Sequence, residues 1–143
     1  MASQERKLLV VDDEEIIHMV LDRIFRDHGI SLCHAFNSEE ALKKLDESFG
    51  VVVTDIKMPG NDGIHFLQNI KKLHPTVQVI IMTGFKSSYV STDVAKELGA
   101  LELVMKPFSK EELVEIVLRG FEKWESAIGD ANTNENASKR KAS

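Results

Sequence analysis

Short runs of apolar residues recur along the chain, and longer stretches with helical spacing separate them. The clearest runs are residues 8–11, 51–53, 77–82 and 103–105, and residues 31–35 form a weaker one. Their content of Val, Ile and Leu is typical of strands that are buried on both faces of a parallel sheet. The pattern therefore predicts five strands.

Helical signals fill the intervals between these runs. Apolar side chains within residues 16–25 recur at three- and four-residue spacing, and Gly29 closes that segment. Two further helices begin where a serine precedes acidic residues, at Ser38 and Ser109. We expect the last helix to span about residues 110–126.

Alternation of five strands with five helices favours an α/β domain with a doubly wound, five-stranded parallel sheet. In this fold class, ligands bind beyond the carboxyl ends of the strands, where the strand order reverses. The side chains that follow the strands are therefore the candidates for function.

The length of 143 residues favours one domain. We expect that domain to span residues 1–128, with its core at about 6–126. No large apolar residue follows Gly129, so we expect residues 129–143 to be a disordered tail or a linker stub.

Charge, hydropathy and cysteine content exclude several functional classes. The net charge is −5 and the basic triplet at residues 139–141 is short, so we expect no intrinsic nucleic-acid binding. No apolar run approaches about 18 residues and no signal peptide is evident, so we expect no membrane contact. Cys33 alone cannot form an internal disulfide, and we interpret it as a small buried residue. These features favour the cytoplasm.

Three aspartates follow two of the predicted strands. Asp12 and Asp13 come directly after the first strand, and Asp55 follows the third. Their carboxylates repel one another unless a cation lies among them, and oxygen ligands with room for water suit Mg²⁺. Alternatively, Asp12 and Asp13 only cap the next helix, where negative charge is favourable.

Two other strand ends add donors to the same edge of the sheet. Thr83 offers a hydroxyl after the fourth strand, and Lys106 offers an ammonium after the fifth. Phosphoryl transfer needs an oxygen nucleophile, a metal and donors for the charge on the transferred group. The strand ends therefore predict a site for phosphoryl transfer.

Four motifs at these strand ends resemble the receiver domain of two-component response regulators. They are Val-Asp-Asp-Glu at 11–14, Asp-Ile-Lys-Met-Pro-Gly-Asn-Asp-Gly at 55–63, Met-Thr-Gly at 82–84 and Lys-Pro-Phe at 106–108. They stand in the family's order, and the likeness spans residues 6–126. The resemblance implies the flavodoxin-like receiver fold and a switch that takes a phosphoryl group from a sensor histidine kinase or a histidine phosphotransfer protein.

The resemblance also implies a metal site. Asp13 would bind Mg²⁺ directly, Asp12 would bind it through water, and Asp55 would be a third ligand. The backbone carbonyl of Lys57 would complete the ligands that the protein supplies.

For the phosphoryl group, the resemblance implies that Asp55 is the acceptor and that Thr83 and Lys106 contact the transferred oxygens. It implies a cis bond between Lys106 and Pro107. Phosphorylation would alter a face formed by residues 87–126, which would contact an output protein of unknown identity or pair with a second copy of the chain.

Three positions depart from the family pattern or modulate it. Leu103 stands where the family usually has an aromatic residue that moves together with the hydroxyl residue, here Thr83. Lys57 and Phe85 flank the path of water to the acyl phosphate, so we expect slow dephosphorylation. Alternatively, the side chains of Lys57 and Phe85 point to solvent.

The favoured function is therefore a switch with self-catalysed chemistry rather than an enzyme that turns over a separate substrate. An alternative is a protein-interaction module that works without phosphorylation. Flavin or nucleotide binding would need a Gly- or Ser-rich loop after the first strand, where this chain has Asp-Asp-Glu-Glu. We interpret the five histidines as surface or helix residues, not as metal or phosphorelay sites; they are residues 18, 28, 34, 65 and 74.

Overall fold

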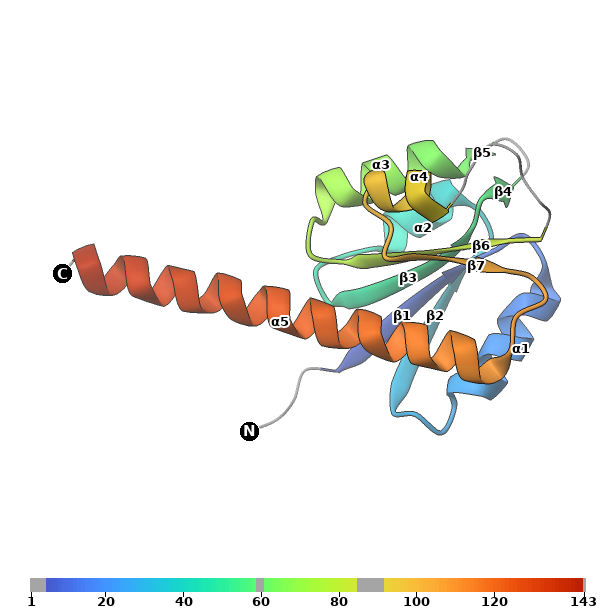
Figure 1. Cartoon of the computed structure of the whole chain (residues 1–143), viewed down its shortest axis with the longest axis horizontal. Helices are drawn as coiled ribbons and strands as arrows, with labels where there is room; N and C mark the ends of the chain where they lie inside the picture. The colour runs from blue at the N-terminus through green and yellow to red at the C-terminus, as the bar shows by residue number, and fades with distance from the viewer. Residues whose placement is uncertain (1–4, 59–60, 85–91, 143) are drawn as a thin grey trace.

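The computed structural model describes residues 5–58, 61–84 and 92–142, and five parallel strands form its central sheet (Figure 1). The strand order reverses between β1 and β3, as expected for a doubly wound fold. The predicted fold class is confirmed. In order across the sheet, the strands are β2 (Ile30–Ala35), β1 (Arg6–Val11), β3 (Phe49–Asp55), β6 (Gln78–Thr83) and β7 (Glu102–Met105).

Helices cover both faces of this sheet (Figure 1). One face packs against α1 (Glu15–Phe25) and α5 (Lys110–Ala142). The other face packs against α2 (Ser38–Lys44), α3 (Gly63–Leu73) and α4 (Thr92–Glu97). A small antiparallel ribbon of β4 (Lys57–Met58) and β5 (Asn61–Asp62) follows β3. The sequence did not predict this ribbon because two-residue strands carry no periodic signal.

The central strands contain continuous apolar runs because alternate side chains enter different core layers. Leu9 and Val52 pack in the layer beneath α2, α3 and α4, whereas Leu8 and Val53 pack beneath α1 and α5. All four are fully buried. Cys33 is half-buried at the edge of the first of these layers.

The register of the strands aligns their carboxyl ends at one edge of the sheet. Because parallel strands run in the same direction, residues that end different strands become neighbours there. The Cα partners nearest this edge are Val11 with Thr54, Asp55 with Met82, and Thr83 with Met105.

The helix α5 is longer than the sequence predicted. It ends at Ala142 instead of near Ser126, and its final turns project beyond the sheet (Figure 1). No proline follows Lys110 to stop the helix, and a single glycine such as Gly129 costs only about 1 kcal/mol. The expected role of residues 129–143 as a disordered tail or a linker stub stays a prediction. Within the described part of the chain, none of the helices combines the length and the apolar character needed to cross a lipid bilayer.

Close contact between α5 and the sheet depends on Gly50 of β3. A Cβ atom at Gly50 would lie 2.7 Å from Cε3 of Trp124 and 2.9 Å from Cδ1 of Phe121. Both rings are buried, and they meet edge to face with centroids 6.2 Å apart. A side chain at residue 50 would therefore push α5 away from β3.

We expect Gly50→Ala to lower the free energy of unfolding by about 1–3 kcal/mol, the usual cost of overpacking a core. Urea unfolding followed by the fluorescence of Trp124 measures the change. Gly129→Ala is the control, because a Cβ there meets nothing within 4 Å. The control should keep or slightly raise the stability of the parent. A Gly50→Ala protein as stable as the parent would contradict this account of the packing.

Candidate functional site

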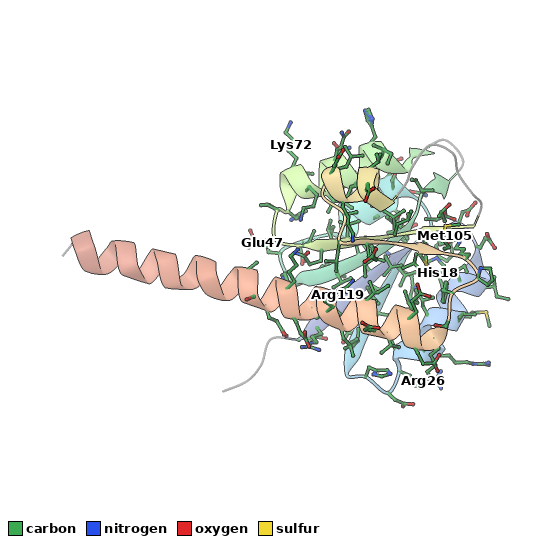
Figure 2. The ribbon with its side chains drawn as sticks, viewed as in Figure 1. His18, Arg26, Glu47, Lys72, Met105 and Arg119 are labelled. Carbon is green, nitrogen blue, oxygen red and sulfur yellow. The ribbon has the colours of Figure 1, made fainter. Side chains whose placement is uncertain are left out.

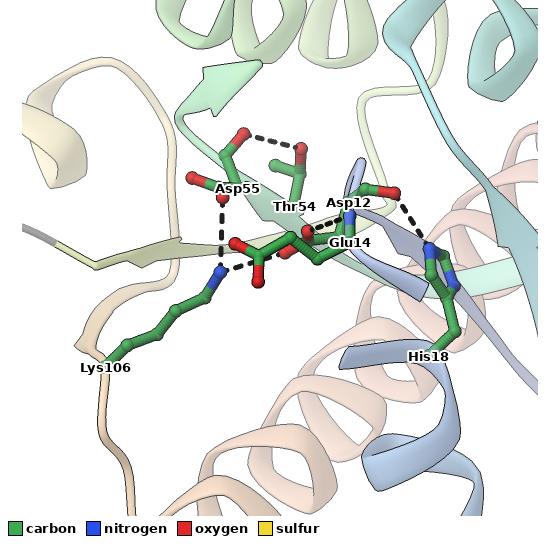
Figure 3. Close-up of polar contacts among 6 residues, drawn as sticks. All are labelled: Asp12, Glu14, His18, Thr54, Asp55 and Lys106. Carbon is green, nitrogen blue, oxygen red and sulfur yellow. Dashed lines mark hydrogen bonds and ion pairs between the residues drawn. The ribbon is translucent and has the colours of Figure 1, made fainter. Parts of the chain in front are cut away.

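Three strand ends bring Asp12, Asp55 and Lys106 into direct contact (Figure 3). Lys106 Nζ donates a hydrogen bond to Asp12 Oδ2 at 2.9 Å and another to Asp55 Oδ2 at 3.2 Å. Asp12 and Asp55 are buried, and the lysine side chain is mostly buried. One ammonium group therefore lies between two carboxylates that follow or end β1 and β3.

The surroundings of Lys106 keep its side chain charged. Burial lowers the pKa of the ammonium, but the hydrogen bonds and charges of Asp12 and Asp55 together outweigh burial and raise the pKa above 10.5. A raised pKa in the folded state stabilises the fold at every pH below about 10.5. This contribution is lost only when the pH rises through the raised pKa.

The backbone around Lys106 directs its side chain toward the site. Its amide donates a hydrogen bond to the carbonyl oxygen of Thr83 at 2.7 Å, which joins the ends of β6 and β7. The bond between Lys106 and Pro107 is cis, as the resemblance implied.

Two further carboxylates join this cluster. One carboxylate oxygen from each of four residues lies within 4.8 Å of the others; the residues are Asp12, Asp13, Glu14 and Asp55. Glu14 was not among the predicted site residues. It is the N-cap residue of α1, but its side chain makes no capping hydrogen bond, and one of its carboxylate oxygens lies within 4.8 Å of an oxygen of Asp55.

This donor set fits a hard divalent cation. Four carboxylates face one ammonium, so negative charge is in excess, and carboxylate oxygens are the ligands that Mg²⁺ prefers. The two interpretations of Asp12 are compatible. Its Oδ1 accepts a hydrogen bond from the amide of Glu14 at 2.8 Å, which supports the start of α1, while its Oδ2 faces Lys106.

The other predicted site residues lie outside the group of four carboxylates. Thr83 is buried at the end of β6, directly after the residue that pairs with Asp55. Leu103 of β7 is half-buried beside the layer beneath α2, α3 and α4. Lys57 begins β4, two residues after Asp55, and its carbonyl as a metal ligand stays a prediction. Phe85 lies outside the described residues.

Comparison with known proteins identifies the family. The family model described as the response regulator receiver domain matches residues 8–118. The chain belongs to the receiver domain family. This match confirms the family and the fold that the four motifs implied. Receiver domains are signalling domains of two-component systems, and membership in the family supports a role as phosphoacceptor.

Relatives of this receiver domain differ in length. It is 36% identical over 112 residues to sporulation initiation phosphotransferase F of Bacillus subtilis, which covers 78% of this chain and 90% of the relative. It is 37% identical over 111 residues to the DNA-binding transcriptional regulator NtrC of Escherichia coli, covering 77% of this chain but 24% of that protein. The chain thus spans about a quarter of the length of its NtrC and NtrX-like relatives.

Solved structures agree with this assignment. A response regulator receiver domain protein from Clostridium thermocellum is 31% identical and superposes with a TM-score of 0.76, covering 82% of this chain and 95% of the other. A CheY-like receiver domain protein from Methanospirillum hungatei is 27% identical, with a TM-score of 0.75 and coverage of 85% and 98%.

We expect Lys106→Met to lower the free energy of unfolding by about 3 kcal/mol without divalent cations. The reason is that the buried carboxylates of Asp12 and Asp55 would lose the positive charge of Lys106. Saturating Mg²⁺ should restore part of the loss, because the cation replaces the missing positive charge. Urea unfolding with and without Mg²⁺ measures both effects.

Lys43→Met is the matched control for this variant. It removes an exposed ion pair with Glu39 within α2 and should change the stability by less than about 0.5 kcal/mol. A metal-free Lys106→Met protein as stable as the parent would show that the ammonium is not the counter-charge of the site.

Proposed function

We propose that this receiver domain is a phosphoacceptor switch and that Asp55 takes the phosphoryl group from a phosphohistidine. The donor is a sensor histidine kinase or a histidine phosphotransfer protein. A carboxylate oxygen of Asp55 attacks the phosphorus atom, the phosphorus–nitrogen bond breaks, and the departing imidazole nitrogen takes up a proton. The product is an acyl phosphate on Asp55.

The observation that carries this proposal is the placement of Lys106 Nζ, 3.2 Å from Asp55 and 2.9 Å from Asp12. Its positive charge stands where negative charge develops on the transferred oxygens, so it stabilises the transition state and the product. The hydroxyl of Thr83, at the adjacent strand end, would donate to another oxygen of the phosphoryl group.

The carboxylate cluster supplies ligands for Mg²⁺. Asp13 would bind the ion directly, Asp12 through water, and Asp55 and the backbone carbonyl of Lys57 would complete the protein ligands. When bound, Mg²⁺ offsets the repulsion between Asp55 and an incoming anionic phosphoryl group. The extra carboxylate of Glu14 increases the need for this compensation.

The output of the switch would pass through Thr83 and Leu103. Leu103 packs beside the layer that contains Ala95 of α4, so a movement of Thr83 toward the phosphoryl group can alter the packing of α4. Because leucine has no polar tip, we expect transmission by repacking and small backbone shifts rather than by exchange of a hydrogen bond.

The affected surface would be the face of residues 87–126, which includes α4, β7 and the first half of α5. It carries an open cleft of about 470 Å³ whose lining includes Lys96, Glu102 and Arg119. Glu102 pairs with Arg119 at 3.0 Å and with Lys96 at 3.7 Å, and Figure 2 shows Arg119 on α5. Such a polar surface suits an output protein or a second copy of the chain.

The surface that receives the phosphoryl donor would be the exposed side of α1. Ile16 and Met19 are 62% and 60% exposed, although both are large apolar residues, and they follow the Asp12–Glu14 turn. Exposed apolar residues beside a site favour a docking protein. A helical donor that packs there would bring its phosphohistidine to the edge of the sheet.

Slow loss of the phosphoryl group is part of the proposal, since Lys57 and Phe85 would obstruct the approach of water to Asp55. The absence of intrinsic nucleic-acid binding and a cytoplasmic location are also predictions. They concern this receiver domain, whose match to a DNA-binding regulator covers 24% of that protein.

Intact mass after incubation with Mg²⁺ and acetyl phosphate tests the acceptor. We expect the parent to gain one phosphoryl group and Asp55→Asn to gain none, because an amide is a poor nucleophile. A folded parent that gains no mass would favour a module that works without phosphorylation.

In the phosphorylated parent, amide chemical shifts should change in β7 and α4 as well as next to Asp55. The variant Phe85→Ala should lose its phosphoryl group faster than the parent.

Ile16→Glu tests the docking surface. With a partner histidine kinase, we expect phosphotransfer to Ile16→Glu to be at least tenfold slower, whereas phosphorylation by acetyl phosphate should stay within twofold of the parent. Leu73→Glu is the matched control, because Leu73 is equally exposed, at 62%, but lies at the far end of α3. Equal transfer rates for both variants and the parent would rule out docking on α1.

A further inference from the structure

Three side chains form a series of hydrogen bonds that ends at the backbone of Asp12. They are Asp22 and His18 of α1 and His34 of β2. His18 Nε2 lies 2.8 Å from the carbonyl oxygen of Asp12 (Figure 3). Nδ1 of the same ring lies 2.6 Å from Nδ1 of His34. His34 Nε2 in turn lies 3.0 Å from Oδ1 of Asp22. His18 is a helix residue, as expected, but it lies on the buried side of α1 and is only 4% exposed, whereas His34 belongs to β2.

The acceptors at the two ends of this series determine the direction of its hydrogen bonds. A carbonyl oxygen and a carboxylate only accept, so Nε2 of His18 donates to Asp12 and Nε2 of His34 donates to Asp22. The two Nδ1 atoms are hydrogen-bonded to each other and link the two rings.

The hydrogen bond from His18 acts on one particular peptide group. The carbonyl of Asp12 belongs to the peptide that joins Asp12 to Asp13, the two proposed ligands from the first strand end. The amide of Asp12 is also fixed, because it donates to the carbonyl of Ala35 at 3.2 Å. Both polar groups of the Asp12 backbone are therefore hydrogen-bonded, the carbonyl to His18 and the amide to Ala35 of β2.

Packing leaves His18 little freedom to move away. The ring of Phe36 lies over it with a centroid separation of 4.3 Å, and the His34 ring meets it edge to face at 4.8 Å. A buried imidazole that only filled space would not need a partner at both nitrogens, because an apolar side chain fills the same volume without hydrogen bonds.

We propose that His18 is a positioning residue for the cation site. By donating to the Asp12 carbonyl, it fixes the peptide between Asp12 and Asp13 and thereby holds the two carboxylates ready for a divalent cation. This inference rests on the proposed function. Partners of metal ligands that act in this way typically contribute 10- to 100-fold to metal affinity.

Two substitutions of His18 separate the hydrogen bond from the volume of the ring. His18→Leu fills the space without a donor, whereas His18→Gln keeps an amide donor at a similar depth. His65→Leu is the matched control, because His65 is exposed on α3. Mg²⁺ affinity is measured by NMR titration of the amide signals, phosphorylation by acetyl phosphate is measured as a function of Mg²⁺, and urea unfolding checks that each variant is folded.

We expect His18→Leu to need about tenfold more Mg²⁺ for half-maximal binding and for half-maximal phosphorylation. Its rate at saturating Mg²⁺ should fall less than threefold, since the reacting groups remain. His18→Gln and His65→Leu should stay within about threefold of the parent in both quantities. If His18 only supported the fold, the substitution would not raise the Mg²⁺ concentration for half-maximal phosphorylation while leaving the rate at saturating Mg²⁺ nearly unchanged.

A second measurement on the parent covers the case in which His18→Leu does not fold. The ¹⁵N signal of His18 Nε2 should show a bound proton and should shift when Mg²⁺ is added. A folded His18→Leu with the parent's Mg²⁺ requirement, equal losses in the Leu and Gln variants, or an Nε2 signal unmoved by Mg²⁺ would each overturn the positioning role. A parent that neither binds Mg²⁺ nor gains a phosphoryl group would overturn the proposed function, and the positioning role with it.

Discussion

The contact of one ammonium group with two carboxylates, from Lys106 to Asp12 and Asp55, is the interaction on which the site depends. It joins three strand ends that lie far apart in the sequence, so it forms only when the parallel register is correct. The carboxylates of Asp13 and Glu14 lie in the same small volume, so four carboxylates gather around one ammonium group. The fold therefore tolerates an excess of negative charge, which costs stability and attracts a cation, as is common at functional sites.

The two core layers make this concentration of charge possible. Continuous apolar strands such as residues 51–53 are buried on both faces and hold the strand ends rigidly in register. The close packing of Trp124 against Gly50 fixes α5 on one face, and the series of hydrogen bonds through His18 and His34 fixes the turn after β1. The charged groups thus lie at the edge of a rigidly packed sheet, where small movements of the strand ends can change the neighbouring protein surface.

The parallel sheet and most of the site residues could be predicted from the sequence. Buried parallel strands leave a strong pattern of apolar runs, and the residues that follow these strands must lie at one edge of the sheet. Glu14 was missed because an acidic residue at the start of a helix has an ordinary explanation in capping. His18 lies three residues before Leu21 and seven before Phe25, on the buried side of α1, so its burial could have been predicted. Its partner could not, because His34 reaches it only through the pairing of β2 with β1.

Chemical trapping of the phosphorylated residue tests the central claim most directly. Borohydride reduces an aspartyl phosphate to homoserine, so peptide mass spectrometry after incubation with Mg²⁺ and acetyl phosphate identifies the acceptor by position. The account predicts homoserine at residue 55 and at no other aspartate. Homoserine at Asp12 or Asp13, or no reduced residue in a folded protein, would contradict it.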